Sequence, residues 1–232
     1  MKFKRLHHQR IAQVLAALDG QMLRELQCLF AGGTAIALKY GEYRESVDLD
    51  FLVSDLPSYR SLRNLVRGED GIFSIMTCAA SSIVTQLTEV RADQYGIRTK
   101  LEVSGQPIKF EIVLEGRIEL SAAGTTDEVM GIATLTKIDM AASKLLALSD
   151  HWADASVYSR DVLDLAILNL SKPELETAIE KAQTAYGKAI TIDLNKAISQ
   201  LKDQDGLLDR CMKAMEITMP KALLWQSIRK LR

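Results

Sequence analysis

The chain of 232 residues is long enough to bury a sizeable core, and its 47% hydrophobic and 25% charged residues are typical of a folded globular protein. Its formal net charge of -1 excludes a global electrostatic attraction to nucleic acid, so any such surface must be a local patch. Cys28, Cys78 and Cys211 lack metal-ligand spacing, which predicts reduced, mostly buried thiols in a cytoplasmic protein.

The first predicted element is an amphipathic helix over residues 1–18, because apolar residues recur there at helical spacing. Residues 21–28 are predicted to form a second, short helix or to continue the first. His7 and His8 fall on the polar side of the first helix, so we expect both to be exposed to solvent. The basic N-terminus lacks the body of a signal peptide, and no segment reaches the ~18 uninterrupted apolar residues of a membrane span.

The next segment combines a glycine pair with two aspartates. Gly32 and Gly33 precede a predicted helix over residues 34–39, and such a turn can bring backbone N–H groups close to a phosphate. A strand is predicted from Asp48 onward, which makes Asp48 and Asp50 share a face. Paired carboxylates favour a cation between them, and Mg²⁺ prefers oxygen ligands and bridges phosphates. Each motif alone is usually a turn or a solvated strand end, but together they predict phosphoryl or nucleotidyl transfer.

The middle of the chain is predicted to be rich in strands. One helix and three strands are expected, over residues 58–67, 83–91, 96–103 and 108–114. Glu111 is a carboxylate within the last of these strands, whose opposite face is apolar. It lies either on an exposed face or beside Asp48 and Asp50 as a third metal or proton-handling carboxylate. Glu115, four residues further on, is the second choice for that role.

From residue 135 onward the chain is predicted to be helical. Six helices are expected, over residues 135–148, 158–170, 173–186, 192–201, 207–215 and 222–231. Ser171 is expected to cap the third of them. A strand-rich part followed by a helical part predicts an α+β fold with a mixed-sheet domain over residues 1–134 and a helical bundle over residues 135–232.

A second charged cluster lies in the helical part. Lys144 is near the edge of an apolar helix face, along which its stem can lie. Asp161 and Asp164 are three residues apart and therefore lie one above the other on their helix. The cluster is either a solvated charged turn or a second half-site. In the half-site, Lys144 binds triphosphate oxygens while Arg160 and Asp161 position it or the acceptor.

Four stretches resemble the AbiEii/AbiGii-type nucleotidyltransferase toxins of bacterial type IV toxin–antitoxin systems, which belong to the DNA polymerase β-like nucleotidyltransferase superfamily. They comprise residues 32–34, residues 44–51, the strand of Glu111, and residues 144–147 followed by 159–161 and Asp164. The resemblance implies a polymerase β-like mixed-sheet domain followed by the helical bundle.

The resemblance also implies roles for individual residues. Asp48 and Asp50 would hold Mg²⁺, with Glu111 as the third ligand. The implied nucleotide-binding set is Gly32, Gly33, Thr34, Ser46, Lys144 and Arg160. The implied catalytic set is Asp48, Asp50, Glu111, Lys144 and Asp161. Many relatives have an arginine where this chain has His151 and Trp152, and protonated His151 is a weak substitute near pH 7.

Members of this family transfer nucleotides from an NTP, several of them to the acceptor end of tRNA, and a cognate antitoxin holds them in check. We therefore expect a cytoplasmic, Mg²⁺-dependent toxin that moves a nucleotide to the 3′ hydroxyl of an RNA, with an antitoxin partner and no membrane partner. One alternative acceptor is a small molecule or a protein. A hypothesis of another class is a catalytically silent relative that acts by protein binding.

Overall fold

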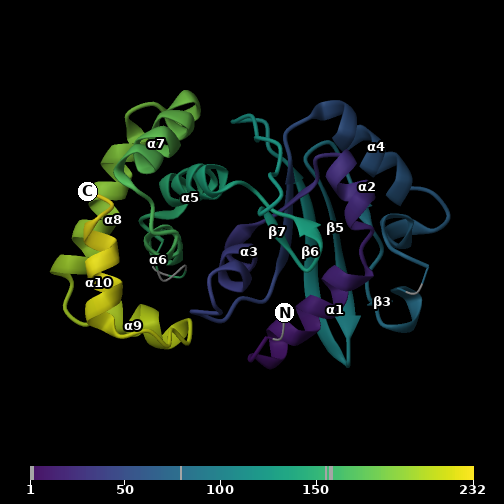
Figure 1. The fold of residues 1–232 in the computed structure, drawn as a ribbon, viewed down its shortest axis with the longest axis horizontal. Helices are drawn as coiled ribbons and strands as arrows, with labels where there is room; N and C mark the ends of the chain where they lie inside the picture. Colours follow the sequence, from purple (N-terminus) through teal and green to yellow (C-terminus); the bar gives the residue numbers. More distant parts are fainter. Residues whose placement is uncertain (1–2, 79, 155, 157–158) are drawn as a thin grey trace. The chain divides into compact units, whose positions relative to one another are not determined.

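A computed structural model of the chain describes residues 3–78, 80–154, 156 and 159–232 (Figure 1). Positions 1, 2 and 158, where two predicted helices were to begin, lie outside the described residues. The chain divides into two compact units. The first extends to Glu42 and resumes over Ser46–Thr136, and the second comprises Tyr43–Glu45 and Lys137–Arg232. The short segment Tyr43–Glu45 therefore belongs to the second unit although the chain on both sides of it belongs to the first.

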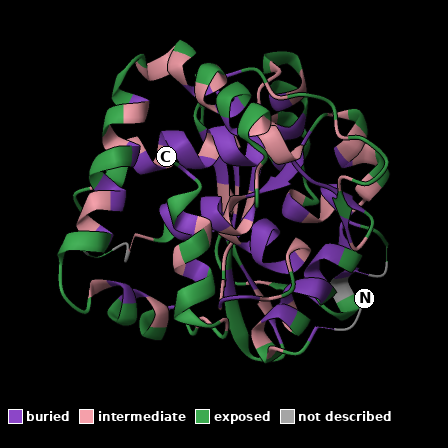
Figure 2. Cartoon of the chain, turned by 60° about the vertical axis from the view of Figure 1, so that its left-hand side comes forward, coloured by how far each residue is buried: buried purple, intermediate pink, exposed green. Residues whose placement is uncertain are grey.

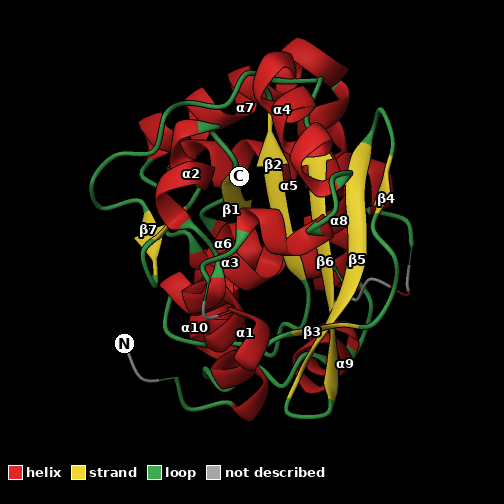
Figure 3. Ribbon diagram, turned by 90° about the vertical axis from the view of Figure 1, so that its right-hand side faces the viewer, coloured by secondary structure: helices red, strands yellow, loops and turns green. Residues whose placement is uncertain are grey.

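The first unit is built on a mixed sheet, which Figure 3 shows in yellow. Its strands in spatial order are β1 (Leu29–Ala31), β2 (Leu49–Val53), β6 (Gln106–Leu114), β5 (Gly96–Val103) and β3 (Thr85–Gln86), with β4 (Arg91–Ala92) also on β5. Only β2 and β6 pair in parallel; the other pairs among these strands are antiparallel. A separate pair, β7 (Glu128–Val129) and β8 (Ile132–Ala133), is also antiparallel.

The predicted strand over residues 83–91 is wrong in its middle. Only its two ends pair with β5, through Thr85 opposite Glu102 and Arg91 opposite Arg98. Between them the chain has two more residues than the partner strand, so the ladder cannot continue. There the side chain of Thr88 replaces a backbone acceptor, since its Oγ1 accepts a hydrogen bond from the backbone N–H of Lys100 at 2.9 Å.

Helices and aromatic side chains complete the first unit. Its α-helices are α1 (Leu6–Ala17), α2 (Gly20–Glu25), α3 (Gly32–Lys39) and α4 (Leu56–Val66). The centroids of the buried rings of Phe30 and Phe110 each lie 5.4 Å from the ring centroid of Phe51, so the aromatic core runs across β1, β2 and β6. Figure 2 shows these central strands as buried or partly buried over most of their length.

The second unit is helical, as predicted. Its described helices are α5 (Lys137–His151), α6 (Arg160–Ile167), α7 (Lys172–Tyr186), α8 (Ala189–Asp203), α9 (Leu207–Ala214) and α10 (Lys221–Arg229). Ser171 caps α7 in a capping box with Glu174, whose carboxylate accepts the Ser171 N–H at 2.7 Å. These bonds, together with Lys137, lower the pKa of Glu174 to about 2.

The α+β class with a mixed sheet is confirmed. Cys28 and Cys211 are buried and Cys78 is exposed, all three as free thiols, and burial raises the pKa of Cys28. None of the helices in the described ranges combines the length and apolar character that a membrane span requires.

Candidate active site

Gly32 brings Asp50 against the start of α3. Ala31 lies opposite Asp50 in the β1–β2 pairing, and Gly32 follows with φ +70°. A Cβ at Gly32 would lie 2.5 Å from Oδ2 of Asp50, so only glycine fits this position without displacement. Gly32 and Gly33 are the first residues of α3, two positions before the predicted start. The first-turn N–H groups of α3, which have no partner within the helix, therefore lie near this carboxylate.

Asp50 lies within β2 and Asp48 directly precedes it, so the strand begins one residue later than predicted. Leu49, Phe51 and Val53 are fully buried, while Asp48 and Asp50 are partly exposed. The predicted alternation is therefore confirmed for Leu49–Val53, while Asp48 lies outside the strand. Two partly exposed carboxylates therefore lie on this segment of the first unit.

Glu111 lies where strand pairing was expected to bring it. Asp50 and Glu111 are direct partners in the parallel β2–β6 ladder. The Glu111 carboxylate is paired with Nζ of Lys109 at 2.5 Å and with Nε of Arg98 at 3.0 Å. Burial disfavours the charge on Lys109, but Glu111, Asp50 and Asp48 together raise its pKa above the ordinary value. Lys109 is thus a cation inside the field of all three carboxylates.

Glu115, the second choice for the third carboxylate, is buried just beyond β6. Its carboxylate accepts hydrogen bonds from Nε and Nη2 of Arg117, at 3.0 and 2.7 Å. A bidentate arginine of this kind uses both carboxylate oxygens.

The donor chemistry of Asp48 and Asp50 suits a hard divalent cation, which takes one or two carboxylates and completes its shell with water and substrate phosphate. No group of three or more His, Cys, Asp and Glu side chains in the described part of the chain is close enough to hold a metal ion. Glu111 forms ion pairs with Lys109 and Arg98. Asp48 and Asp50 therefore fit the part of such a site that protein carboxylates supply.

The phosphate-binding candidates of the first unit are joined by a hydroxyl contact. Thr34, in the first turn of α3, is buried, and its Oγ1 lies 2.8 Å from Oγ of Ser46. Ser46 and Gly33 are partly exposed. The structure thus brings Ser46, from the loop before β2, onto the same helix start that holds Gly32 and Gly33.

The second unit contains a buried ion cluster around Asp164. The guanidinium of Arg44 donates to Asp164 from Nε at 2.8 Å and from Nη2 at 3.0 Å, and the hydroxyl of Tyr43 donates to the same carboxylate. Nζ of Lys144 lies 2.9 Å from Asp164 and 2.9 Å from Asp161. All five side chains are buried, so the interpretation of a solvated charged turn is wrong.

Mutual compensation keeps these groups charged. Burial favours the neutral form of Asp164, but Arg44 and Lys144 lower its pKa below the ordinary value. Burial also disfavours the charge on Lys144, yet Asp164 and Asp161 raise its pKa. For Tyr43, burial and Asp164 both raise the pKa, so its hydroxyl keeps its proton and donates it.

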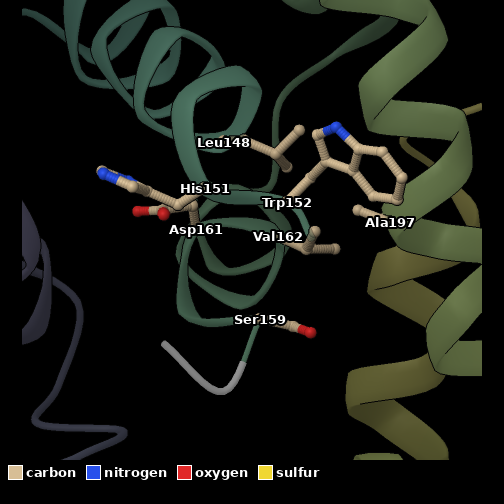
Figure 4. Close-up of a pocket in the computed structure, with 7 residues that line it drawn as sticks. All are labelled: Leu148, His151, Trp152, Ser159, Asp161, Val162 and Ala197. Atoms are coloured by element: carbon tan, nitrogen blue, oxygen red, sulfur yellow. The ribbon is translucent and has the colours of Figure 1, made fainter. Parts of the chain in front are cut away.

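A small pocket borders this cluster within the second unit. Its lining residues are Leu148, His151, Trp152, Ser159, Asp161, Val162 and Ala197. Figure 4 shows His151 and Asp161 on one side of the pocket and Trp152 next to Ala197 on the other. Asp161 therefore belongs both to the ion cluster and to the pocket wall, while Arg160 next to it is exposed.

Arg44 and Tyr43 are the cluster members that sequence reasoning missed. The available signal was Asp164 itself, since Asp164, Leu165 and Leu168 fall on one side of α6 and a carboxylate on a buried face needs a cation. That signal predicts a cationic partner, but it does not predict that the partner is Arg44, which lies 120 positions earlier in the chain.

The family model that matches most of the chain defines the class: this is a nucleotidyltransferase. The chain belongs to the AbiEii family of nucleotidyltransferase toxins, since the family described as nucleotidyl transferase AbiEii toxin, type IV TA system, matches residues 13–228.

Two solved structures are similar to this chain. JHP933 from Helicobacter pylori has 18% identity and a TM-score of 0.50 over 99% of this chain and 93% of that chain. A proposed nucleotidyltransferase from H. pylori has 19% identity and a TM-score of 0.49 over 97% of this chain and 92% of that chain. At such identities the likeness to JHP933 concerns the fold alone. A search of curated proteins found no match.

Proposed function

We propose that this chain transfers a nucleotide from an NTP to an acceptor hydroxyl in a Mg²⁺-dependent reaction, and that the acceptor is the 3′ end of an RNA such as tRNA. The observation that carries the proposal is the contact of Asp50 with the glycine-led start of α3, with Asp48 two residues away. This arrangement offers N–H donors for phosphate and carboxylates for a cation on adjoining backbone.

In the proposed reaction the acceptor hydroxyl attacks the α-phosphate in line, and pyrophosphate leaves. Backbone groups at Gly32 and Gly33, with the hydroxyls of Thr34 and Ser46, bind and orient the phosphates. Mg²⁺ held by Asp48 and Asp50 would neutralise charge on the entering and leaving oxygens. The chain's own contribution is positioning and electrostatics, which is what this chemistry requires.

Glu111 of the first unit and Lys144, Arg160 and Asp161 of the second unit are proposed as further functional residues. Glu111 either takes the hydroxyl proton or joins the metal ligands, and its position opposite Asp50 supports both roles. Lys144 is proposed to bind the triphosphate and Asp161 to hold it, and their 2.9 Å ion pair supports this coupling. Arg160 is exposed and supplies a further cation for phosphate.

The proposal of an RNA acceptor is supported by a basic hollow on the second unit. It is lined by Ile198, Lys202, Trp225, Arg229 and Arg232, which give three cations and an indole with no carboxylate among them. Arg232 is held in place by Nη2 donating to Oγ of Ser199 at 2.7 Å. Cations next to an aromatic face suit a single-stranded nucleic acid, whose bases stack and whose phosphates are neutralised.

Replacing Trp225 with alanine is expected to weaken binding of a labelled single-stranded RNA by about tenfold, since base stacking on an aromatic side chain contributes ~1–3 kcal/mol. Fluorescence anisotropy at several salt concentrations measures the effect. Trp152→Ala is the matched control, because Trp152 lies in the other pocket against Lys196. Equal affinities for both variants and the wild type would remove this support for RNA.

The function itself is tested by incubating the chain with α-labelled NTPs, Mg²⁺ and total RNA or cell lysate. We expect label in RNA, lost when EDTA is added. Label only in protein or small molecules would exclude the RNA acceptor while leaving nucleotidyl transfer intact.

A cognate antitoxin is the proposed protein partner, and membership of a type IV toxin family supports it. Co-expression of the chain with the product of a neighbouring reading frame, scored by growth, tests this proposal. Growth arrest that no neighbouring product relieves would contradict it.

A further inference from the structure

Two adjacent histidines of α1 bond to both ends of one dipeptide in the loop before β2. Nε2 of His8 accepts the backbone N–H of Ser46 at 3.2 Å, and Nε2 of His7 lies 3.1 Å from the carbonyl oxygen of Val47. The predicted exposure of His8 is wrong, because it is fully buried, whereas His7 is partly exposed. The loop covers the polar side of the helix, which helical periodicity cannot reveal.

These contacts fix the proton positions on both rings. A backbone N–H can only donate, so Nε2 of His8 carries no proton and Nδ1 carries one. That Nδ1 lies 2.9 Å from Oε1 of Glu42, which accepts it. The carbonyl of Val47 can only accept, so His7 presents a protonated Nε2. The two rings thus act in opposite senses, His8 as acceptor and His7 as donor.

Glu42 in turn is fixed by the chain just before α1. Its carboxylate accepts the backbone N–H groups of Lys4 at 2.7 Å and Arg5 at 3.1 Å. Burial opposes the charge of Glu42, but these bonds and His8 lower its pKa. A charged acceptor orients the His8 ring, as a carboxylate does for many functional histidines.

His7 and His8, which hold Ser46 and Val47 through these hydrogen bonds, form a clamp on the loop before β2. Ser46 connects this clamp to the candidate phosphate site. Its hydroxyl contacts Thr34 of α3, and Asp48 follows two residues later. We propose that the His7–His8 pair is a positioning device that holds Ser46 for nucleotide binding, so that nucleotide affinity depends on the acceptor at Nε2 of His8. This inference rests on the proposed function of the Ser46 site.

The rival explanation is that the His7–His8 pair only anchors α1. Two matched variants of His8 distinguish this explanation from the positioning of Ser46. The amide of glutamine reaches the position of Nε2, so His8→Gln keeps an acceptor for the Ser46 N–H. The shorter amide of asparagine reaches only the position of Nδ1, so His8→Asn keeps the bond to Glu42 and loses Ser46. Each variant loses one hydrogen bond, so anchoring alone predicts similar effects.

The test measures the affinity of the full chain for ATP, GTP, CTP and UTP with Mg²⁺ by calorimetry, along with the melting temperature. For the nucleotide that the wild type binds most tightly, we expect His8→Asn to raise Kd by about fivefold, as loss of one net hydrogen bond implies. His8→Gln is expected to stay within about twofold. His7→Leu, at a partly exposed position, should also raise Kd without endangering the fold.

Each outcome decides one point. Equal Kd values for His8→Asn, His8→Gln and His7→Leu would overturn the clamp, and so would an affinity loss that follows melting temperature in every variant. No binding of any nucleotide by the wild type would instead reject the proposed function, and the inference with it.

Discussion

Replacing Asp48 with asparagine is expected to lower nucleotide transfer by about 10³-fold while leaving the fold intact. The change removes one of two carboxylates assigned to the cation, and ~4 kcal/mol of lost transition-state stabilisation corresponds to that factor. Asparagine keeps the size of the side chain, and Asp48 is partly exposed at the end of the loop that leads into β2. The measurement is the initial rate of label transfer from the preferred NTP, with circular dichroism as a check on folding.

The matched control is Asp70→Asn, which removes the same charge from an exposed position outside the site. It should leave the rate within about twofold. Growth arrest on expression gives an independent readout: if the Asp48→Asn variant arrests growth as strongly as the wild type, the chain acts by binding and the enzymatic explanation of toxicity is wrong.

Local patterns were sufficient to predict most elements and the aspartate pair. Alternation predicted β5 over Gly96–Val103, and helical spacing predicted each described helix of the second unit. Asp50 was predictable because its neighbours Leu49 and Phe51 must face the core. Such predictions succeed because the information lies within a few residues of the element concerned.

The missed features depend on contacts between distant segments. His8 is on the polar side of α1, and only the loop around Ser46 buries it. Asp164 finds its cation in Arg44, and no short-range pattern links the two. One of the two expectations for Glu111 put it beside Asp50, as the strand pairing has it, but its ion pair with Arg98 of β5 depends on rotamers that the strand pattern does not fix. Polar side chains satisfied by distant partners are therefore where sequence reasoning stops.

Removing the carboxylate of Asp164 is expected to give the largest loss of stability. Asp164→Ala would remove this buried carboxylate from Arg44 and leave Lys144 paired with Asp161, and breaking a buried ion pair in this way costs about 3–5 kcal/mol. The free energy of unfolding, from urea titration followed by circular dichroism, measures the effect. Asp209→Ala, which breaks an exposed pair with Lys221, is the matched control and should cost less than ~1 kcal/mol.

The lowered pKa of Asp164 also predicts the direction in which stability changes with pH. The pKa of Asp164 is lower in the folded chain than its ordinary value of ~3.9, so the stability that its charge contributes is present above about pH 4 and is lost as pH falls through the folded-state pKa. Below about pH 4, the wild type should therefore lose stability more steeply with falling pH than Asp164→Asn, whose amide does not titrate. Two results would show that the buried cluster does not stabilise the second unit as its geometry indicates. One is that stability falls equally steeply with pH in the wild type and in Asp164→Asn. The other is that Asp164→Ala lowers the free energy of unfolding no more than Asp209→Ala does.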